Sequence, residues 1–295
     1  MSIFSFTSGT MITSSPIAAF DLDDTLFTKS NVALPNVVEK LERVSETHSI
    51  VIISNQKQSH ISDKRLSERL QTIMKLLPVP FRAYCSRMED NNRKPNIGIL
   101  SVIKKDYKDC NVEFYVGDAA GRAGDHSDCD LMFAKNAKIP FYTPEQYFSP
   151  APFITEEELK VVSEQEKTVV ILTGFPGSGK STFASKYFPN HTLVSKDVQK
   201  TKTLKVMETA LKSGKNVIVD NLNWNSEKRK EYIDLSKKYN FTVISVHVAT
   251  SMNESMDRNE HRERVVPKVV YYTYRKNFEY PCVEEGFDKV YAFSS

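Results

Sequence analysis

The fold of this chain is constrained above all by a repeated alternation of short apolar runs with longer amphipathic segments. The alternation opens with the apolar run "PIAAFDL" (16–22), and the segment "LPNVVEKLERVSE" (34–46) follows with its valines and leucine on one helical face. Such an alternation is typical of βαβ units, in which helices connect parallel strands. The further elements that it predicts are a strand at 49–54, a helix near 62–77, a strand at 80–85, a helix opened by Pro95 and a strand at 112–117.

A second alternation of the same kind begins with the strand-like run at 168–174 and continues through those at 216–220 and 241–248. Between the two halves, over 143–167, the pattern changes to prolines and then to charged residues, which favours a connection rather than a core element. We therefore predict an α/β protein of two domains, each a doubly wound parallel sheet, over residues 1–150 and 151–295.

The composition narrows the class of protein. Of the 295 residues, 40% are hydrophobic, which is enough for two cores of ordinary size. The longest apolar runs have only the length of a strand, so we expect a soluble protein with no membrane span. The four cysteines are scattered without CxxC spacing, which favours small buried side chains in a reducing compartment such as the nucleus, cytoplasm or mitochondrion. The net charge of +3 is compatible with a polyanionic partner but does not demonstrate one.

The sequence "GFPGSGKST" (174–182) matches the pattern G-x-x-x-x-G-K-[ST], follows an apolar run and precedes a segment that can open a helix. In this context backbone amides and the helix start surround the phosphates of a nucleotide, which favours an ATP site over a glycine-rich turn that binds nothing. Lys180 would bridge the outer phosphates, and Ser181 would hold Mg²⁺. The predicted ATP-binding residues are Gly174, Pro176, Gly177, Ser178, Gly179, Lys180, Ser181 and Thr182.

Candidate residues for phosphoryl transfer follow later apolar runs. Asp197, after "HTLVS", could accept the proton of an attacking hydroxyl group, and the alternative is an N-cap for the next helix. Asp220 ends "NVIVD" as a Walker-B-like acid would, although "DNLNWN" could also form only a cap and a turn. Arg258 and Arg262 would share a helical face and could clamp the transferred phosphoryl group, although a solvated face is the alternative. Lys196 is a candidate contact to backbone phosphates, and an exposed helix is again the alternative.

An acidic cluster follows the first apolar run of the chain. In "DLDDT" the alternation of an extended segment places Asp21 and Asp23 on the same side. One carboxylate can attack phosphorus to form an aspartyl-phosphate, and the other can protonate the leaving alkoxide. A divalent cation such as Mg²⁺ would relieve the repulsion between them. We therefore predict that both residues are catalytic and also metal ligands.

Later strand ends would complete this site, because the carboxyl ends of parallel strands lie along one edge of a sheet. Ser54 and the amide of Asn55 could hold phosphate oxygens, and Lys94 could neutralise the phosphoenzyme. Asp118 and Asp125, in "GDAAGRAGD", would supply further carboxylates for the metal. Each residue alone could be a turn or a cap, but together they predict a phosphatase.

The motifs "FDLDDT", "SNQ", "RKP" and "GDAAGR", in this order, resemble those of the haloacid-dehalogenase-type phosphatases. Together with "GFPGSGKSTF", "VSKD", "VIVDN" and "YRKNFEYPCVEEGF", they resemble the polynucleotide kinase 3′-phosphatase family from about Ile17 to Phe293. The resemblance implies a haloacid-dehalogenase-like Rossmannoid phosphatase domain followed by a P-loop kinase domain. It also implies one enzyme that removes 3′-phosphates from nucleic-acid ends and phosphorylates 5′-hydroxyl ends with ATP.

The resemblance assigns roles to individual residues. It implies that Asp21 is the nucleophile, Asp23 the general acid and Asp118 a Mg²⁺ ligand. In the kinase half it implies that Lys180 binds phosphate and that Asp197 is the base on the 5′-hydroxyl.

Three features depart from the family pattern. Asp24 stands where glycine is usual, Ser54 stands where threonine is common, and "RNEHRER" differs from the usual arginine-rich lid. We expect these departures to bear on metal affinity at the first site and on which arginine of the lid contacts the transferred phosphate, but not on the chemistry. The resemblance also leaves no residues for the amino-terminal forkhead-associated domain of the animal enzymes, so we expect no recruitment by phosphorylated scaffolds. We expect a monomer.

The expected substrates are DNA ends with a 3′-phosphate or a 5′-hydroxyl, in strand-break repair. RNA ends remain an alternative, because both groups occur in RNA and no residue is devoted to the 2′-hydroxyl. A small-molecule kinase fused to a metabolite phosphatase is a second alternative, and a repair scaffold without catalysis is a third. Trp224 and the aromatic segment 269–278 could stack on bases or adenine, although aromatic residues at helical spacing are more often part of a core.

Overall fold

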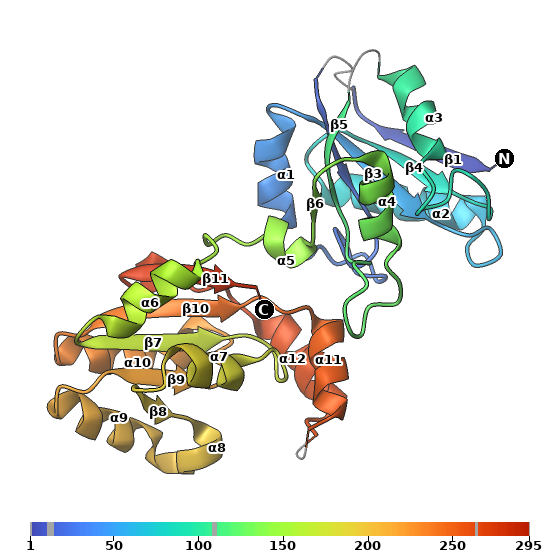
Figure 1. The fold of residues 1–295 in the computed structure, drawn as a ribbon. Coiled ribbons are helices and arrows are strands. Elements are labelled where there is room, and N and C mark those ends of the chain that lie inside the picture. Colours follow the sequence, from blue (N-terminus) through green and yellow to red (C-terminus); the bar gives the residue numbers. More distant parts are fainter. Residues whose placement is uncertain (1, 11–14, 108–110, 263–264, 295) are drawn as a thin grey trace. The chain divides into compact units, whose positions relative to one another are not determined.

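The computed structural model describes residues 2–10, 15–107, 111–262 and 265–294. The chain divides into two compact units, Met1–Ser149 and Pro150–Ser295. Each unit is a parallel-stranded sheet with helices on both faces (Figure 1), so the predicted α/β class and the doubly wound sheets are confirmed.

The sheet of the first unit has the strand order β1-β4-β3-β2-β5-β6, and all neighbours are parallel except β1 and β4. From β2 the chain adds strands on one side of the sheet and then returns to add strands on the other side. The carboxyl end of β2 is therefore the switch point of the sheet, where loops diverge and leave a crevice. The strands are β1 (Ile3–Ser8), β2 (Ile17–Phe20), β3 (Ser49–Asn55), β4 (Phe81–Ser86), β5 (Val112–Val116) and β6 (Phe141–Tyr142).

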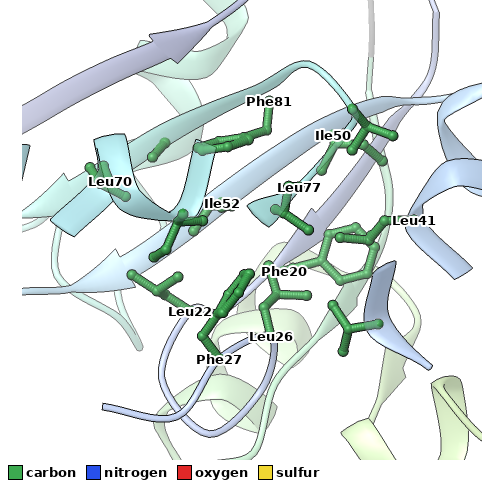
Figure 2. Close-up of a cluster of buried hydrophobic side chains, with 14 of the residues drawn as sticks. Phe20, Leu22, Leu26, Phe27, Leu41, Ile50, Ile52, Leu70, Leu77 and Phe81 are labelled. Carbon is green, nitrogen blue, oxygen red and sulfur yellow. The ribbon is translucent and has the colours of Figure 1, made fainter. Parts of the chain in front are cut away.

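Helices cover both faces of this sheet. α1 (Val37–Ser45) and α2 (Asp63–Leu76) bury leucines and isoleucine on one face, together with Phe20, Leu22 and Phe27 from the segment that carries the acidic motif (Figure 2). α3 (Gly98–Asp106) and α4 (Cys129–Ala137) pack on the other face. The acidic segment is thus fixed by the apolar side chains on either side of its carboxylates.

The sheet of the second unit is entirely parallel and has the order β11-β10-β7-β9-β8. β7 is central and precedes the glycine-rich loop, with β9 and β8 on one side and β10 and β11 on the other. The strands are β7 (Thr168–Thr173), β8 (Thr192–Val194), β9 (Val217–Asp220), β10 (Thr242–Val248) and β11 (Lys289–Phe293).

Four of the helices of the second unit pack on the faces of its sheet. α6 (Glu156–Glu164) and α7 (Lys180–Tyr187) lie on one face, and α9 (Thr203–Lys212) and α10 (Ser226–Lys238) lie on the other. The remaining helical elements are α8 (Lys196–Gln199), η1 (Lys200–Lys202), α11 (Met252–Glu260), α12 (Lys268–Asn277) and η2 (Val283–Glu285).

The structure corrects three expectations about local structure. The segment expected to be a connection contains α5 (Pro144–Tyr147) and α6, each opened by a capping box, and α6 buries Leu159 and Val162 in the core. The helix expected to open at Pro95 begins at Gly98, because 90–97 form successive turns. Strand β1 was not expected, since the apolar residues of its sequence "IFSFTS" alternate over too short a run.

The described helices include none with the length and the apolar character that a membrane span requires. The cysteines are not uniformly buried as expected. Cys85 is buried and Cys129 is half-buried, but Cys282 is exposed, and all three are free thiols. Cys110 lies outside the described residues.

Asp24 adopts a left-handed backbone conformation with φ of 53°, which explains why glycine suits this position. We expect Asp24→Val to lower the free energy of unfolding by about 1–2 kcal/mol, because a β-branched residue is strained at positive φ. Asp24→Gly should change it by less than about 1 kcal/mol, because relief of strain offsets the added entropy of the unfolded chain. Urea unfolding followed by circular dichroism measures both. A valine variant as stable as the parent would contradict the strained conformation.

Candidate active sites

Three carboxylates meet at the switch point of the first sheet. Asp21 directly follows β2, Asp118 follows β5, and Asp130 lies in the first turn of α4. One carboxylate oxygen from each residue lies within 4.8 Å of the other two. A group of carboxylate oxygens so close together fits Mg²⁺, which is a hard cation that prefers oxygen ligands.

Lys94 joins two of these three carboxylates. Its Nζ atom donates hydrogen bonds of 2.6 Å to Asp21 Oδ1, 2.6 Å to Asp130 Oδ1 and 2.7 Å to Tyr115 Oη. Although burial opposes its charge, Asp130 and Asp21 hold the pKa of Lys94 well above its ordinary value. The ammonium group is therefore charged and is available to neutralise a phosphoryl group on Asp21.

One ammonium group does not compensate all the negative charge of the cluster. Burial raises the pKa of Asp21 to about 7 against the opposing effect of Lys94, and Asp130 and Asp23 add to the rise. Burial also raises the pKa of Asp118 to about 8, with further contributions from Asp21 and Asp130. A divalent cation between Asp21 and Asp118 would favour the ionised form of both carboxyls.

Asp130 was missed by the sequence analysis. Its Oδ1 accepts hydrogen bonds from Lys94 and Tyr115, and its Oδ2 accepts one from the backbone amide of Ala119 at 3.1 Å. A Cβ atom at Gly117 would lie 2.5 Å from Asp130 Cγ, so a glycine is needed at the end of β5 for this approach. Since both its oxygens are occupied, Asp130 mainly positions Lys94, and Asp21 and Asp118 are the more accessible ligands.

Asp125 is not part of the carboxylate cluster, contrary to expectation. Its Oδ2 accepts hydrogen bonds from the backbone amides of Ala120 and Arg122, and both its oxygens accept from the guanidinium of Arg122. Asp125 therefore stabilises the loop that carries Asp118. Of the four carboxylates predicted as metal ligands, the cluster contains Asp21 and Asp118 but neither Asp23 nor Asp125, and Asp130 completes it.

Asp23 has two hydrogen-bond donors that the sequence did not indicate. Arg69, from α2, donates to its Oδ1 at 2.7 Å, and Gln56 donates to its Oδ2 at 2.6 Å. Gln56 also donates to the buried hydroxyl of Ser54 at 3.0 Å. The side chain of Asn55 pairs with the backbone N–H and C=O of Lys94 at 3.0 Å each. Ser54 and Asn55 thus join the acidic motif and the lysine loop to the end of β3.

The second unit has a cavity of about 810 Å³ above the carboxyl ends of its strands. Lys180 lies in its wall, and its Nζ donates to the carbonyl oxygens of Gly174 at 2.9 Å and Phe175 at 2.6 Å. Burial lowers the pKa of Lys180 to about 8. Phosphate oxygens would restore the charge of this buried ammonium, as expected for a residue that binds nucleotide phosphates. Of the residues predicted for ATP binding or phosphoryl transfer, those that line the cavity are Pro176, Gly177, Gly179, Lys180, Ser181, Thr182, Asp197, Asp220, Arg258 and Arg262, and the candidates Lys196 and Trp224 line it as well.

Two further residues predicted to bind ATP, Gly174 and Ser178, do not line the cavity but shape the glycine-rich loop at 174–182. The backbone of Gly174 has φ of 145°, and a Cβ atom there would lie 2.7 Å from Ser178 Oγ. Ser178 is fully buried, and its backbone oxygen accepts a hydrogen bond from the hydroxyl of Thr250 at 2.9 Å. Both residues therefore fix the curvature of the loop from beneath.

The structure distinguishes between the alternatives for two acids. The hydroxyl of Ser181 donates to Asp220 Oδ2 at 2.6 Å, which is the arrangement that a Walker-B-like acid and a Mg²⁺-binding serine require. Asp197 is not the N-cap of α8, because Ser195 holds that position and accepts from the backbone amide of Asp197. Asp197 is exposed and lines the cavity that also contains the phosphate-binding loop.

Arg258 and Arg262 do not share a helical face as expected. Helix α11 ends at Glu260, so Arg258 lies in its last turn and Arg262 in the turn that follows. Both arginines nevertheless line the cavity. The guanidinium of Arg258 donates to Glu254 at 2.6 Å, one helical turn away.

Comparison with known proteins agrees with this arrangement. Residues 16–148 match the family model described as polynucleotide kinase 3 phosphatase, and residues 169–281 match that of an AAA domain. A bifunctional polynucleotide phosphatase/kinase of Schizosaccharomyces pombe is 32% identical, and the match covers 92% of this chain and 78% of the relative. The chain belongs to the bifunctional polynucleotide phosphatase/kinase family. The expectation of a two-part enzyme of this family is therefore confirmed.

Two further relatives show how the halves of a phosphatase/kinase recur. A putative bifunctional polynucleotide phosphatase/kinase of Acanthamoeba polyphaga mimivirus is 30% identical over 93% of this chain and 83% of its own length. The polynucleotide 3′-phosphatase ZDP of Arabidopsis thaliana is 31% identical, but the match covers only 47% of this chain and 24% of that protein. The similarity to that protein is therefore limited to less than half of this chain and about a quarter of the relative.

We expect Mg²⁺ to raise the thermal midpoint of this phosphatase/kinase more at about pH 8.5 than at about pH 6. In the folded protein the pKa of Asp21 is raised to about 7 and that of Asp118 to about 8, from an ordinary aspartate pKa of 3.8. Without a cation the folded state therefore loses stability progressively as the pH rises from the ordinary pKa to these two raised values. A bound cation offsets that cost, most strongly where both groups are ionised. Thermal unfolding with and without MgCl₂ at the two pH values measures the difference.

Two variants serve as controls for this prediction. Asp118→Asn should remove most of the Mg²⁺ effect, because it removes a charged ligand. Asp125→Asn should keep more of the Mg²⁺ effect than Asp118→Asn does, because it removes no ligand, while lowering stability by about 1–3 kcal/mol, because it leaves donors of the loop unsatisfied. An unchanged Mg²⁺ effect in Asp118→Asn would show that the cation binds elsewhere.

Proposed function

We propose that this protein heals broken DNA ends, with a 3′-phosphatase site in residues 1–149 and a 5′-hydroxyl kinase site in residues 150–295. The observation that carries the proposal is the presence in one chain of a lysine-centred carboxylate site and a P-loop site with its own acid and base. Together the two reactions convert a 3′-phosphate and a 5′-hydroxyl into ends that a ligase can join.

In the phosphatase site, Asp21 attacks phosphorus through the carboxylate oxygen that Lys94 does not hold. The bond from phosphorus to the 3′-oxygen breaks, and Asp23 gives its proton to the released alkoxide. A water molecule then attacks the aspartyl-phosphate, Asp23 takes its proton, and phosphate leaves. Arg69 and Gln56 both donate hydrogen bonds to Asp23 in the structure. When Asp23 carries a proton, either Gln56 turns its amide oxygen toward that proton or one of the two donors moves away.

In the kinase site, Asp197 accepts the proton of the 5′-hydroxyl as its oxygen attacks the γ-phosphorus of ATP. The bond to the β,γ-bridging oxygen breaks and ADP leaves. Lys180 and the backbone amides of the loop hold the phosphates, and Arg258 and Arg262 compensate the charge of the transferred group.

The proposed cofactors are Mg²⁺ and ATP. Mg²⁺ held by Asp21 and Asp118 in the first site, and by Ser181 and Asp220 in the second, would neutralise phosphate charge and orient the reacting oxygens. We further propose that the protein acts as a monomer in a reducing compartment such as the nucleus, cytoplasm or mitochondrion, which suits its free thiols.

Substitutions at the two sites should abolish separate activities. Asp21→Asn removes the nucleophile and should lower phosphatase activity by at least about 1,000-fold without loss of kinase activity. Lys180→Ala removes the phosphate-binding cation and should lower kinase activity by about 100-fold or more without loss of phosphatase activity. Release of phosphate from a 3′-phosphorylated oligonucleotide and labelling of a 5′-hydroxyl oligonucleotide measure the two activities. Loss of both activities in either variant would be incompatible with two independent sites.

A competition between nucleic acids tests the proposed substrate. Matched DNA and RNA duplexes, each with a nick that carries a 3′-phosphate and a 5′-hydroxyl, are offered together and each reaction is measured separately. We expect DNA to be the better substrate in both reactions, and preference for RNA would assign the protein to RNA healing. A salt titration of substrate binding distinguishes a nucleic acid from a metabolite, because contacts to several backbone phosphates make binding fall steeply with salt and a metabolite should give a shallow dependence.

A further inference from the structure

The order of the second sheet separates the two substrates of the kinase. Asp197, the proposed base, follows β8, and the loop at 221–225 follows β9, so both lie on the same side of β7 and its phosphate-binding loop. The two segments are joined by a hydrogen bond of 2.7 Å from the backbone N–H of Lys196 to Asn221 Oδ1. The acceptor must reach Asp197, so this side of the cavity belongs to the acceptor rather than to the nucleoside of ATP.

Trp224 lies in the wall of this acceptor side. Its indole is half-buried and meets the ring of Tyr274 edge-on, with 6.5 Å between the centroids and 69° between the planes. The lining combines charged and amide side chains with the apolar Leu222, Val266 and Val270, and Trp224 is the one aromatic residue among the described residues that form it. A large aromatic surface in such a wall favours a flat, apolar partner.

The loop that carries Trp224 is held by several contacts. Arg229 is fully buried, and its guanidinium donates to the backbone oxygens of Asn223 at 2.9 Å and Glu279 at 3.0 Å. The side chain of Asn223 donates to the backbone oxygen of Leu172 at 2.8 Å, and the backbone N–H of Glu279 donates to the backbone oxygen of Trp224 at 2.7 Å. The backbone beneath the indole is therefore fixed before any ligand binds, which lowers the entropic cost of binding.

Two lysines flank this surface. Lys196 and Lys228 both line the cavity and are exposed. Within the described part of the chain, neither ammonium group has a hydrogen-bond or ion-pair partner. Ammonium groups beside an aromatic ring are the combination that binds a base and its neighbouring phosphates in single-stranded nucleic acid.

We propose that Trp224 stacks on the terminal nucleobase of the 5′-hydroxyl strand, and that Lys196 and Lys228 bind the first backbone phosphates beyond it. This inference rests on the proposed kinase function and adds a residue that positions the acceptor. Because every base presents a π face, stacking would detect the presence of a terminal base but not its identity. The kinase would thus distinguish an intact terminal nucleotide from an abasic one.

Fluorescence tests the inference in the unmodified protein, because Trp224 is the single tryptophan of the chain. A 5′-hydroxyl oligodeoxynucleotide should quench the emission of Trp224 as it binds. The same oligonucleotide with an abasic 5′-terminal nucleotide should cause much less quenching at saturation, and ATP alone should cause little. Equal quenching by the two oligonucleotides, or quenching by ATP alone, would overturn the assignment.

Kinetics provide a second test. Trp224→Ala should raise the KM for the acceptor by about 5- to 150-fold, as expected from the contribution of base–aromatic stacking. The KM for ATP and kcat should change by less than about threefold, which also verifies that the variant is folded. Trp224→Phe should retain most of the affinity. With the abasic acceptor, Trp224→Ala and the parent protein should have the same KM.

Matched controls come from the same elements. Tyr272→Ala removes an aromatic residue of α12 that is 50% exposed and does not line the cavity, so it should leave the acceptor KM unchanged. Lys228→Ala should weaken acceptor binding. It should also reduce the slope of log affinity against log salt concentration by the amount that about one phosphate contact contributes. Lys230→Ala, on the same helix α10, should do neither, because Lys230 pairs with Asp234 at 3.0 Å and points elsewhere.

The outcomes separate this inference from the proposed function. If the parent protein phosphorylates oligonucleotides but Trp224→Ala has an unchanged acceptor KM, the stacking role is wrong and the kinase function stands. If the parent protein phosphorylates no oligonucleotide, the proposed function itself is wrong, and the inference fails with it.

Discussion

The first unit depends on one buried ammonium group that is shared by two carboxylates. Lys94 would be costly to bury alone, and although burial opposes its charge, its pairs with Asp21 and Asp130 keep the pKa of its ammonium group above the ordinary value. The surroundings serve this arrangement. Asn55 fixes the backbone of Lys94, and Gly117 allows Asp130 to approach. The third carboxylate, Asp118, has no such partner among the lysines that the structure describes, so burial raises its pKa to about 8 and its charge is balanced by a proton or by a bound cation.

The second unit places its site at the same point of a parallel sheet but with the opposite electrostatic character. Its central strand leads into a loop of backbone amides and a lysine whose pKa burial lowers to about 8. Basic side chains outnumber acidic ones in the described lining of this site, whereas carboxylates outnumber the single ammonium group in the first. The difference corresponds to the two chemistries. A nucleophilic carboxylate needs a cation before it can approach a phosphate ester, whereas a loop that receives a triphosphate needs positive potential of its own.

Much of both sites could be predicted because their residues lie at or just after the ends of apolar strands, and parallel strands bring their carboxyl ends together. Asp21, Asp118 and Asp220 are of this kind, and Lys180 was found from the glycine-rich loop that follows β7. Asp130 and Arg69 could not be found in this way, since they project from helices and reach the site only through packing.

Some features that the sequence analysis predicted wrongly have local sequence patterns that could have been recognised. The spacing of Asp125 from Arg122 is that of a local ion pair. The pattern T-x-x-E at 155–158 announces the start of α6. The end of α11 before Arg262 is harder to foresee, because the charged residues continue past the helix without a glycine or proline.

Arg229 connects parts of the chain that are distant in sequence. It forms a bidentate ion pair with Glu285, at 2.7 Å and 2.6 Å, and also holds the backbone of the loop after β9. This loop is therefore of fixed length, since an inserted or deleted residue between Asp220 and Arg229 would break either the strand end or the clamp. Length variation among relatives should accordingly be confined to other connections of this unit, and removal of the segment after α12 would loosen the catalytic face of the sheet rather than merely shorten the chain.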